Sequence, residues 1–200
     1  MGTSSEFIGA SALWRPVAVD RLEAALKRVV VRAQAAISGC EAAGLTLLRN
    51  GRTMSVVSTA DIARELDVAQ CRADEGPSLD AIRQLQVFNV GQAAHAASWP
   101  RFRKAAAAGG ILSILSVPLT AGGEALGALN LYSSVQDAFA GCEAEAVMFA
   151  AEAAATLSGA GTLPDPVEPH PVTRGVPRPR LMLVEEHQFF APREDRSGIV

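Results

Sequence analysis

The chain has 200 residues, of which 49% are hydrophobic, and 18 basic residues against 21 acidic ones give a formal net charge of -3. This length predicts one packed domain with an appendage. The charge balance argues against a nucleic-acid-binding surface and against a polybasic membrane patch. The three cysteines form no C-x-x-C pair, no uncharged apolar run is long enough to span a membrane, and no signal peptide is recognisable. We therefore expect free thiols in a cytoplasmic protein.

Composition changes near both ends of the chain. Residues 1–16 are small and polar without periodicity, which predicts a disordered leader before a domain at residues 17–160. Residues 161–200 are rich in proline, which lacks a backbone donor and favours extended chain, so a tail is expected there. The short apolar segment 181–190 within this tail could bind a protein partner.

The first predicted element is a helix. Apolar residues at helical spacing form one stripe, with Asp20 as its N-cap and Gly39 as its C-terminal stop. The stripe consists of Leu22, Leu26, Val29, Val30, Ala33 and Ile37. Two runs rich in β-forming residues then flank Asn50-Gly51, which is the dipeptide most typical of a two-residue hairpin turn.

The middle of the domain is irregular. The predicted elements are, in order, a short helix at residues 61–70 capped by Asp61, a second that starts at Pro77, a strand at 86–90 and a helix at 99–108 that Gly109-Gly110 ends. Two long strands joined at Gly122-Gly123 follow, and an alanine-rich helix closed by Gly159 ends the domain. Tight turns make the strand pairs antiparallel, and the terminal helices can cover one face of the sheet, so the order predicts an α+β layered domain.

The last strand carries a polar interruption in an apolar run. Side chains alternate between the two faces of a strand, so Asn130 and Tyr132 point to one face while Leu129 and Leu131 point to the other. The apolar pair suits the side covered by the terminal helices. The polar pair suits the opposite side, where it could meet a ligand.

The preceding strand is assigned to faces through the turn between the two strands. If this turn keeps the usual short register, Ser113, Leu115 and Val117 share the face of the polar pair. Ile114 and Ser116 then join the apolar face.

Four motifs in series carry a resemblance to a known family. They are EGPSLDAI, SWPRF, ILSVPL and GALNLYS, in that order and near the usual spacing. With them, the run from Cys40 to Ser158 resembles a GAF domain, most closely the actinobacterial GAF modules that are joined to an ANTAR RNA-binding output. The resemblance implies a central antiparallel sheet of five or six strands. It also implies terminal helices on one face, often in a dimer, and an irregular helical segment that roofs the other face and can form a small-molecule pocket.

Two departures limit what this resemblance transfers. Ser78 stands where family members often have cysteine, and after Ala160 only the proline-rich tail follows. We therefore expect no ANTAR helices and no RNA binding. The family also binds many ligands or none, so the fold does not fix the function.

The sequence thus predicts a non-catalytic sensory module that binds a small molecule of unknown identity through Ser113, Leu115, Asn130 and Tyr132. We expect a cytoplasmic homodimer, formed through the apolar terminal helices, that signals through a partner. No cofactor is named, and no metal site is expected because ligands at a recognised spacing are lacking. The alternative is a GAF fold used as a dimerisation or interaction scaffold, in which Asn130 only satisfies a buried backbone group.

Three chemical alternatives stay open. The carboxylates within residues 74–80 could do acid–base work beside Ser78, although negative charge at a helix start explains them more simply. His95 could bind haem. Cys71 with Cys142 could reduce free methionine sulfoxide, as some GAF-fold enzymes do, but Cys142 and Cys40 are expected to lie apart from the pocket.

Overall fold

The computed structural model describes residues 10–91 and 98–159, with side chains from Val19 onward. The elements in chain order are α1 (Ala10–Ala36), β1 (Ala42–Arg49), β2 (Arg52–Ser58), α2 (Asp61–Ala73), α3 (Pro77–Gln84), β3 (Phe88–Val90), α4 (Pro100–Ala108), β4 (Ser113–Ala121), β5 (Glu124–Ser133) and α5 (Glu143–Gly159). The predictions for His95 and for the tail at 161–200, including its segment 181–190, lie outside the described residues. No helix in the described ranges combines the length and apolar character needed to span a membrane.

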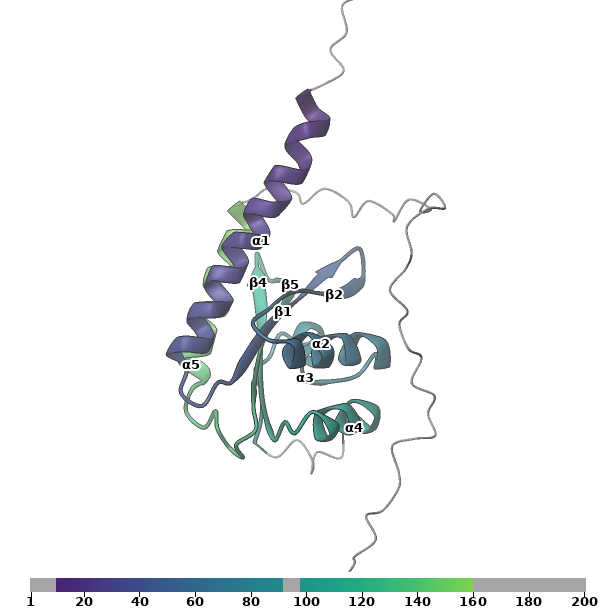
Figure 1. Ribbon diagram of the computed structural model, residues 1–200, viewed down its shortest axis with the longest axis vertical. Helices are drawn as coiled ribbons and strands as arrows, with labels where there is room; N and C mark the ends of the chain where they lie inside the picture. The colour runs from purple at the N-terminus through teal and green to yellow at the C-terminus, as the bar shows by residue number, and fades with distance from the viewer. Residues whose placement is uncertain (1–9, 92–97, 160–200) are drawn as a thin grey trace, which may run out of the picture. The chain divides into compact units, whose positions relative to one another are not determined.

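The five strands form one antiparallel sheet in the order β2-β1-β5-β4-β3. Helices α1 and α5 lie together on one face of this sheet, and α2, α3 and α4 lie on the other (Figure 1). The expected α+β class, the antiparallel pairing and the separation of terminal from internal helices are therefore confirmed.

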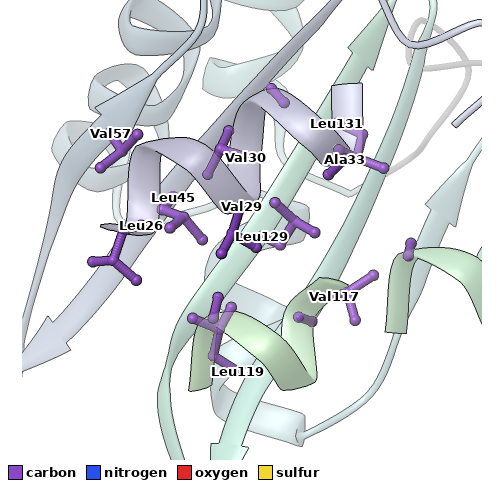
Figure 2. Close-up of a cluster of buried hydrophobic side chains, with 14 of the residues drawn as sticks. Leu26, Val29, Val30, Ala33, Leu45, Val57, Val117, Leu119, Leu129 and Leu131 are labelled. Atoms are coloured by element: carbon purple, nitrogen blue, oxygen red, sulfur yellow. The ribbon is translucent and has the colours of Figure 1, made fainter. Parts of the chain in front are cut away.

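The core under the terminal helices uses the predicted stripe of α1. All six stripe residues are buried in one cluster with apolar side chains from the strands and from α5. Figure 2 shows Val29 and Val30 of α1 turned toward strand residues such as Leu129. Burying a side chain of this size stabilises the fold by about 1.5–3 kcal/mol, so this stripe holds α1 on the sheet.

The start of α1 differs from the prediction. The helix begins at Ala10, inside the segment expected to be a disordered leader, so Asp20 lies within the helix and is not its N-cap. Alanine, serine and leucine at residues 10–13 are compatible with a helix, and a helix that starts earlier needs no cap at Asp20. The predicted end is confirmed, since Gly39 has φ +75° just after the last turn.

The local signals of the middle segment are largely confirmed. Asn50 and Gly51 have φ of 48° and 73° and join β1 to β2, as the hairpin turn requires. Pro77 is the first residue of α3. Asp61 is the first residue of α2, whereas Ala60 occupies the N-cap position.

The register of β4 against β5 differs from the prediction and moves residues between faces. Near the turn, Ala121 pairs with Glu124, but beyond an irregularity at Leu119 and Thr120 the pairing shifts by one residue. Such a bulge places an extra residue on one strand. Because the side-chain period of a strand is two, a shift of one residue exchanges the faces.

The exchange overturns the predicted faces of β4. Ser116, and not Leu115, is the residue opposite Asn130. Leu115 and Val117 belong to the core under α1 and α5. Ile114 packs on the opposite side, in a cluster that includes Tyr132.

Candidate functional site

Helix α2 covers the face of the sheet opposite α1 and α5 (Figure 1). A buried polar network lies between this helix and the strands. The buried residues of α2 are Ala63, Leu66, Asp67 and Gln70, which follow helical spacing and face the sheet. Two of these four residues are polar, so the face that anchors α2 is itself partly polar. Asp67 has a relative exposure of 0% and Gln70 one of 1%.

The carboxyl group of Asp67 is the centre of this network. Its Oδ1 accepts a hydrogen bond from the Tyr132 hydroxyl at 2.5 Å and another from Asn130 Nδ2 at 2.8 Å. Its Oδ2 has only a long contact of 3.5 Å with the Ser55 hydroxyl. The group also fits over Gly44, where an added Cβ would lie 2.2 Å from Oδ2. Only glycine at this position lets α2 approach so closely.

The side chain of Asn130 links three strands to α2. Its Oδ1 accepts from the Ser116 hydroxyl at 2.9 Å, and its Nδ2 also donates to Thr46 Oγ1 at 3.2 Å. With the bond to Asp67, both ends of the amide have protein partners. Asn130 therefore acts as an internal tie in this state.

Gln70 extends the network to the start of α3. Its Nε2 donates to the Tyr132 hydroxyl at 3.2 Å, and its Oε1 accepts from the backbone N–H of Ser78 at 2.8 Å. The Ser78 hydroxyl is buried and has no hydrogen-bond partner. A buried hydroxyl without a partner is uncommon, so the Ser78 hydroxyl is the group of this network that can still form a hydrogen bond.

Burial changes the acidity of several groups here. It raises the pKa of Asp67 to about 7, because the bonds from Tyr132, Asn130 and Ser55 offset only part of the cost of burying the charge. Burial and the neighbouring Asp67 charge raise the pKa of Tyr132 well above its usual value. Burial also raises the pKa of the Cys71 thiol. The phenol and the thiol therefore stay protonated at neutral pH.

The four predicted ligand-binding residues are thus divided between the two faces. Asn130 and Tyr132 come together as expected, but Leu115 lies in the core beneath the terminal helices. Ser113 also lies away from the network. Its hydroxyl is 2.6 Å from the Val135 carbonyl oxygen and accepts the N–H of Ala138 at 3.2 Å, so it orders the loop after β5.

Asp67 and Gln70 were not predicted from the sequence. The signal that could have found them is their position on the buried stripe of α2, where polar residues are unusual.

Two of the three carboxylates at residues 74–80 serve helix starts, whereas Asp74 follows the end of α2. Asp80 lies in the first turn of α3 and accepts the Trp99 indole N–H at 2.8 Å. Glu75 accepts the N–H groups of Arg101 and Phe102, at 2.5 and 3.0 Å, at the start of α4. Burial acts to raise the pKa of Glu75, but these N–H groups outweigh it and lower the pKa. Both residues fit the structural explanation.

All three cysteines are free. Cys40 and Cys142 pack against the core under the terminal helices, whereas Cys71 lies on α2, on the other side of the sheet. Burial raises the pKa of Cys40 to about 11, which keeps this thiol in its unreactive form. Within residues 10–91 and 98–159, no three histidine, cysteine or acidic side chains are grouped so that they could hold a metal ion.

The sequence profile of the GAF domain matches residues 20–158, which is most of the described chain. The chain belongs to the GAF domain family. The match covers every strand and all helices except the beginning of α1 and the last residue of α5. No curated protein matches the chain.

Solved GAF-fold structures resemble this GAF domain at low identity. A type II free methionine-R-sulfoxide reductase from Thermoplasma acidophilum has a TM-score of 0.56 and 14% identity, covering 71% of this chain and 96% of that one. The blue-light absorbing form of the Thermosynechococcus elongatus PixJ GAF domain has a TM-score of 0.56 and 14% identity, covering 71% of this chain and 88% of that one. The GAF domain of an Acinetobacter phosphoenolpyruvate-protein phosphotransferase has a TM-score of 0.53 and 14% identity, covering 76% of this chain and 96% of that one. At this identity the likeness establishes the fold alone.

Proposed function

We propose that this chain is a non-catalytic regulatory GAF module, in which the face covered by α2 and α3 binds a small molecule and the α1–α5 face transmits the response to a partner. The observation that carries the proposal is the division of β5. Asn130 and Tyr132 bind the buried network under α2, while the alternate residues Leu129 and Leu131 pack in the core with α1 and α5. A displacement of this one strand acts on both faces, because packed interiors transmit strain.

The proposed binding residues are Asn130, Tyr132, Gln70 and Ser78. Gln70 and Ser78 replace Ser113 and Leu115, which the register of β4 places on the other face. In the described state Gln70 occupies the N-terminus of α3 with its own amide oxygen. A ligand with a hydrogen-bond acceptor could take this place, and the unpartnered Ser78 hydroxyl could then donate to it.

The test starts from native mass spectrometry of freshly purified protein, which reports a retained compound and the oligomeric state together. We expect a bound small molecule whose affinity falls about tenfold in Ser78→Ala, as the loss of one hydrogen bond implies. Thermal unfolding of ligand-free Ser78→Ala should match that of the wild type, because the removed hydroxyl has no partner. Ser98→Ala, at an exposed hydroxyl, is the matched control. Retention of no compound, with unchanged melting across a metabolite panel, contradicts the ligand-binding role.

A scaffold without ligand is the second candidate, and a specific observation favours it. The Asn130 amide is already satisfied by Ser116, Thr46 and Asp67, so no ligand is needed to complete it. Exposed apolar side chains on α1 and α5 offer a surface for a second copy of the chain. A dimer with no bound compound in the same mass spectra would support this role.

The remaining expectations stay proposals. The cytoplasmic location is supported by the three free cysteines. The absence of catalysis is supported by the raised pKa of two thiols and by their positions on opposite sides of the sheet, which suit a reductase poorly. RNA binding, known from the ANTAR-linked modules that the sequence resembles, is not proposed.

A further inference from the structure

The network under α2 contains a buried acid whose partners are all uncharged. Asp67 has a relative exposure of 0%, and the interactions that influence its ionisation come from Tyr132, Asn130 and Ser55. A buried carboxylate without a cation is unfavourable, and such a group tends to take up a proton.

The oxygen that would hold this proton can be identified from the geometry. Oδ1 accepts two short hydrogen bonds, from Tyr132 and Asn130. Oδ2 has only the 3.5 Å contact with Ser55 Oγ and faces the backbone at Gly44. A proton taken from water and placed on Oδ2 can point to Ser55 while Oδ1 keeps both donors. Protonation thus keeps both short hydrogen bonds to Oδ1, reverses only the direction of the long contact with Ser55, and removes the charge.

Two titratable groups interact with Asp67. The phenol of Tyr132 on β5 is hydrogen-bonded to it, and the thiol of Cys71 on α2 feels its charge. The charged side chains of the other elements packed against α2 are partly or fully exposed. These are Arg49 and Arg52 on β1 and β2, Asp80 and Arg83 on α3, Arg101, Arg103 and Lys104 on α4, and Glu124 on β5. Arg83 pairs with Asp74 and Asp80, and Arg101 pairs with Glu75. These pairs hold two of the cations at the surface.

We propose that Asp67 is a proton-operated latch, whose neutral form holds α2 on the sheet and whose ionisation makes α2 easier to open, so that pH regulates access to the face under α2 and α3. The proposal rests on the proposed function in taking this face as the sensing one. When α2 opens, Asp67 reaches water and titrates as an ordinary aspartic acid.

The direction of the pH effect follows from the two states. Burial raises the pKa of Asp67 to about 7 when α2 is closed, against an ordinary value of 3.8 for an exposed aspartic acid. Between these two values the closed state holds one proton more than the open state. The opening constant of α2 should therefore rise about tenfold for each pH unit in that window and become level above pH 7. The latch is fully closed in acid and loosest above neutrality.

The test uses the full chain without ligand. The titration of Asp67 is followed by NMR of ¹³C-labelled aspartate carboxyl groups, and the opening of α2 by hydrogen exchange of its amides from pH 5 to 8, corrected for intrinsic exchange. We expect the Asp67 carboxyl group to titrate with a midpoint near pH 7 and the opening constant to rise about tenfold for each pH unit below that midpoint. In Asp67→Asn, which imitates the neutral acid, α2 should stay protected without that slope. Asp61→Asn, at an exposed carboxyl of the same helix, should behave as the wild type.

Tyr132→Phe keeps the test open if Asp67→Asn folds poorly. It removes a donor that favours the ionised form, so the carboxyl midpoint should move to higher pH. An unmoved midpoint in Tyr132→Phe, or a wild-type slope in Asp67→Asn, overturns the latch. Neither measurement involves a ligand. A failed latch thus leaves the Ser78→Ala binding test intact, and a protein without ligand leaves the titration intact.

Discussion

Asn130 is the residue on which the buried network depends most. It is fully buried and holds Ser116, Thr46 and Asp67 in place through one amide. In Asn130→Leu the volume is similar, but these three groups lose a partner. We expect the free energy of unfolding to fall by about 1–3 kcal/mol, measured by chemical denaturation without ligand. Gln86→Leu, at an exposed amide, is the control, and equal stability of both variants would show that Asn130 is no tie.

The second prediction for a single residue concerns Gly44, which lies directly under the carboxyl group of Asp67. A Cβ there would lie 2.2 Å from Asp67 Oδ2, closer than two such atoms can approach. Gly44→Ala should therefore push α2 from the sheet and lower stability by about 1–3 kcal/mol. Gly159→Ala, where the added atom meets nothing within 4 Å, should be nearly neutral. A stable Gly44→Ala with unchanged exchange in α2 would contradict the close packing described for this helix.

Single residues also differ in how far their roles can be predicted from the sequence. Asn130 and Tyr132 were predictable as a pair, because alternation along one strand needs no knowledge of its partners. Asp67 was not, because a carboxylate on a helix is normally solvated. The contact with Gly44 and the hydrogen bonds from Asn130 and Tyr132, all residues far away in sequence, show why the carboxyl group is buried.

At the scale of elements, the start of α4 depends on a side chain from outside the helix. Glu75 accepts two N–H groups of its first turn, and its pKa is lowered by them against the effect of burial. Glu75→Gln should increase the exchange of the Arg101 and Phe102 amides at neutral pH, measured by NMR. A carboxylate whose pKa is lowered by folding stabilises the fold above its ordinary pKa, and this stabilisation is lost when the group is protonated. The wild type should therefore lose the protection of these amides as the pH falls below the ordinary pKa of glutamate. Glu65→Gln, on the exposed side of α2, should leave the same amides unchanged.

Helices and turns with a strong local sequence pattern could be predicted from the sequence. The pairing of the strands could be predicted only in part. The stripe of α1 and the Asn50-Gly51 turn follow from helical periodicity and turn chemistry, which act within a few residues. The bulge near Leu119 has no such signal, since it depends on how two strands twist against each other. That one irregularity explains why Ser113 and Leu115 were assigned to the wrong face.

At the scale of the whole molecule, the outer surface of the terminal helices predicts assembly. Val31 on α1 is 46% exposed, and Val147 and Met148 on α5 are 43% and 73% exposed. Exposed apolar side chains on two neighbouring helices favour an interface, and a two-fold dimer is the commonest result. We expect a dimer mass by light scattering at micromolar concentration and a monomer for Met148→Glu. Met54→Glu, at an exposed methionine on β2, should remain a dimer, and a monomeric wild type would end this prediction.

The place of Asp67 above Gly44 also decides in which direction α2 can move. The neighbours of Gly44 on the same face of β1 are Ala42 and Thr46, since side chains alternate along a strand. Each has a side chain where Gly44 has none, so the carboxyl group cannot slide along β1 in either direction. Shear of α2 along β1 is thus blocked, whereas a hinged lift away from the strands meets neither side chain. Such a lift changes the height of α2 above β1, and a signal can pass through this helix in that form.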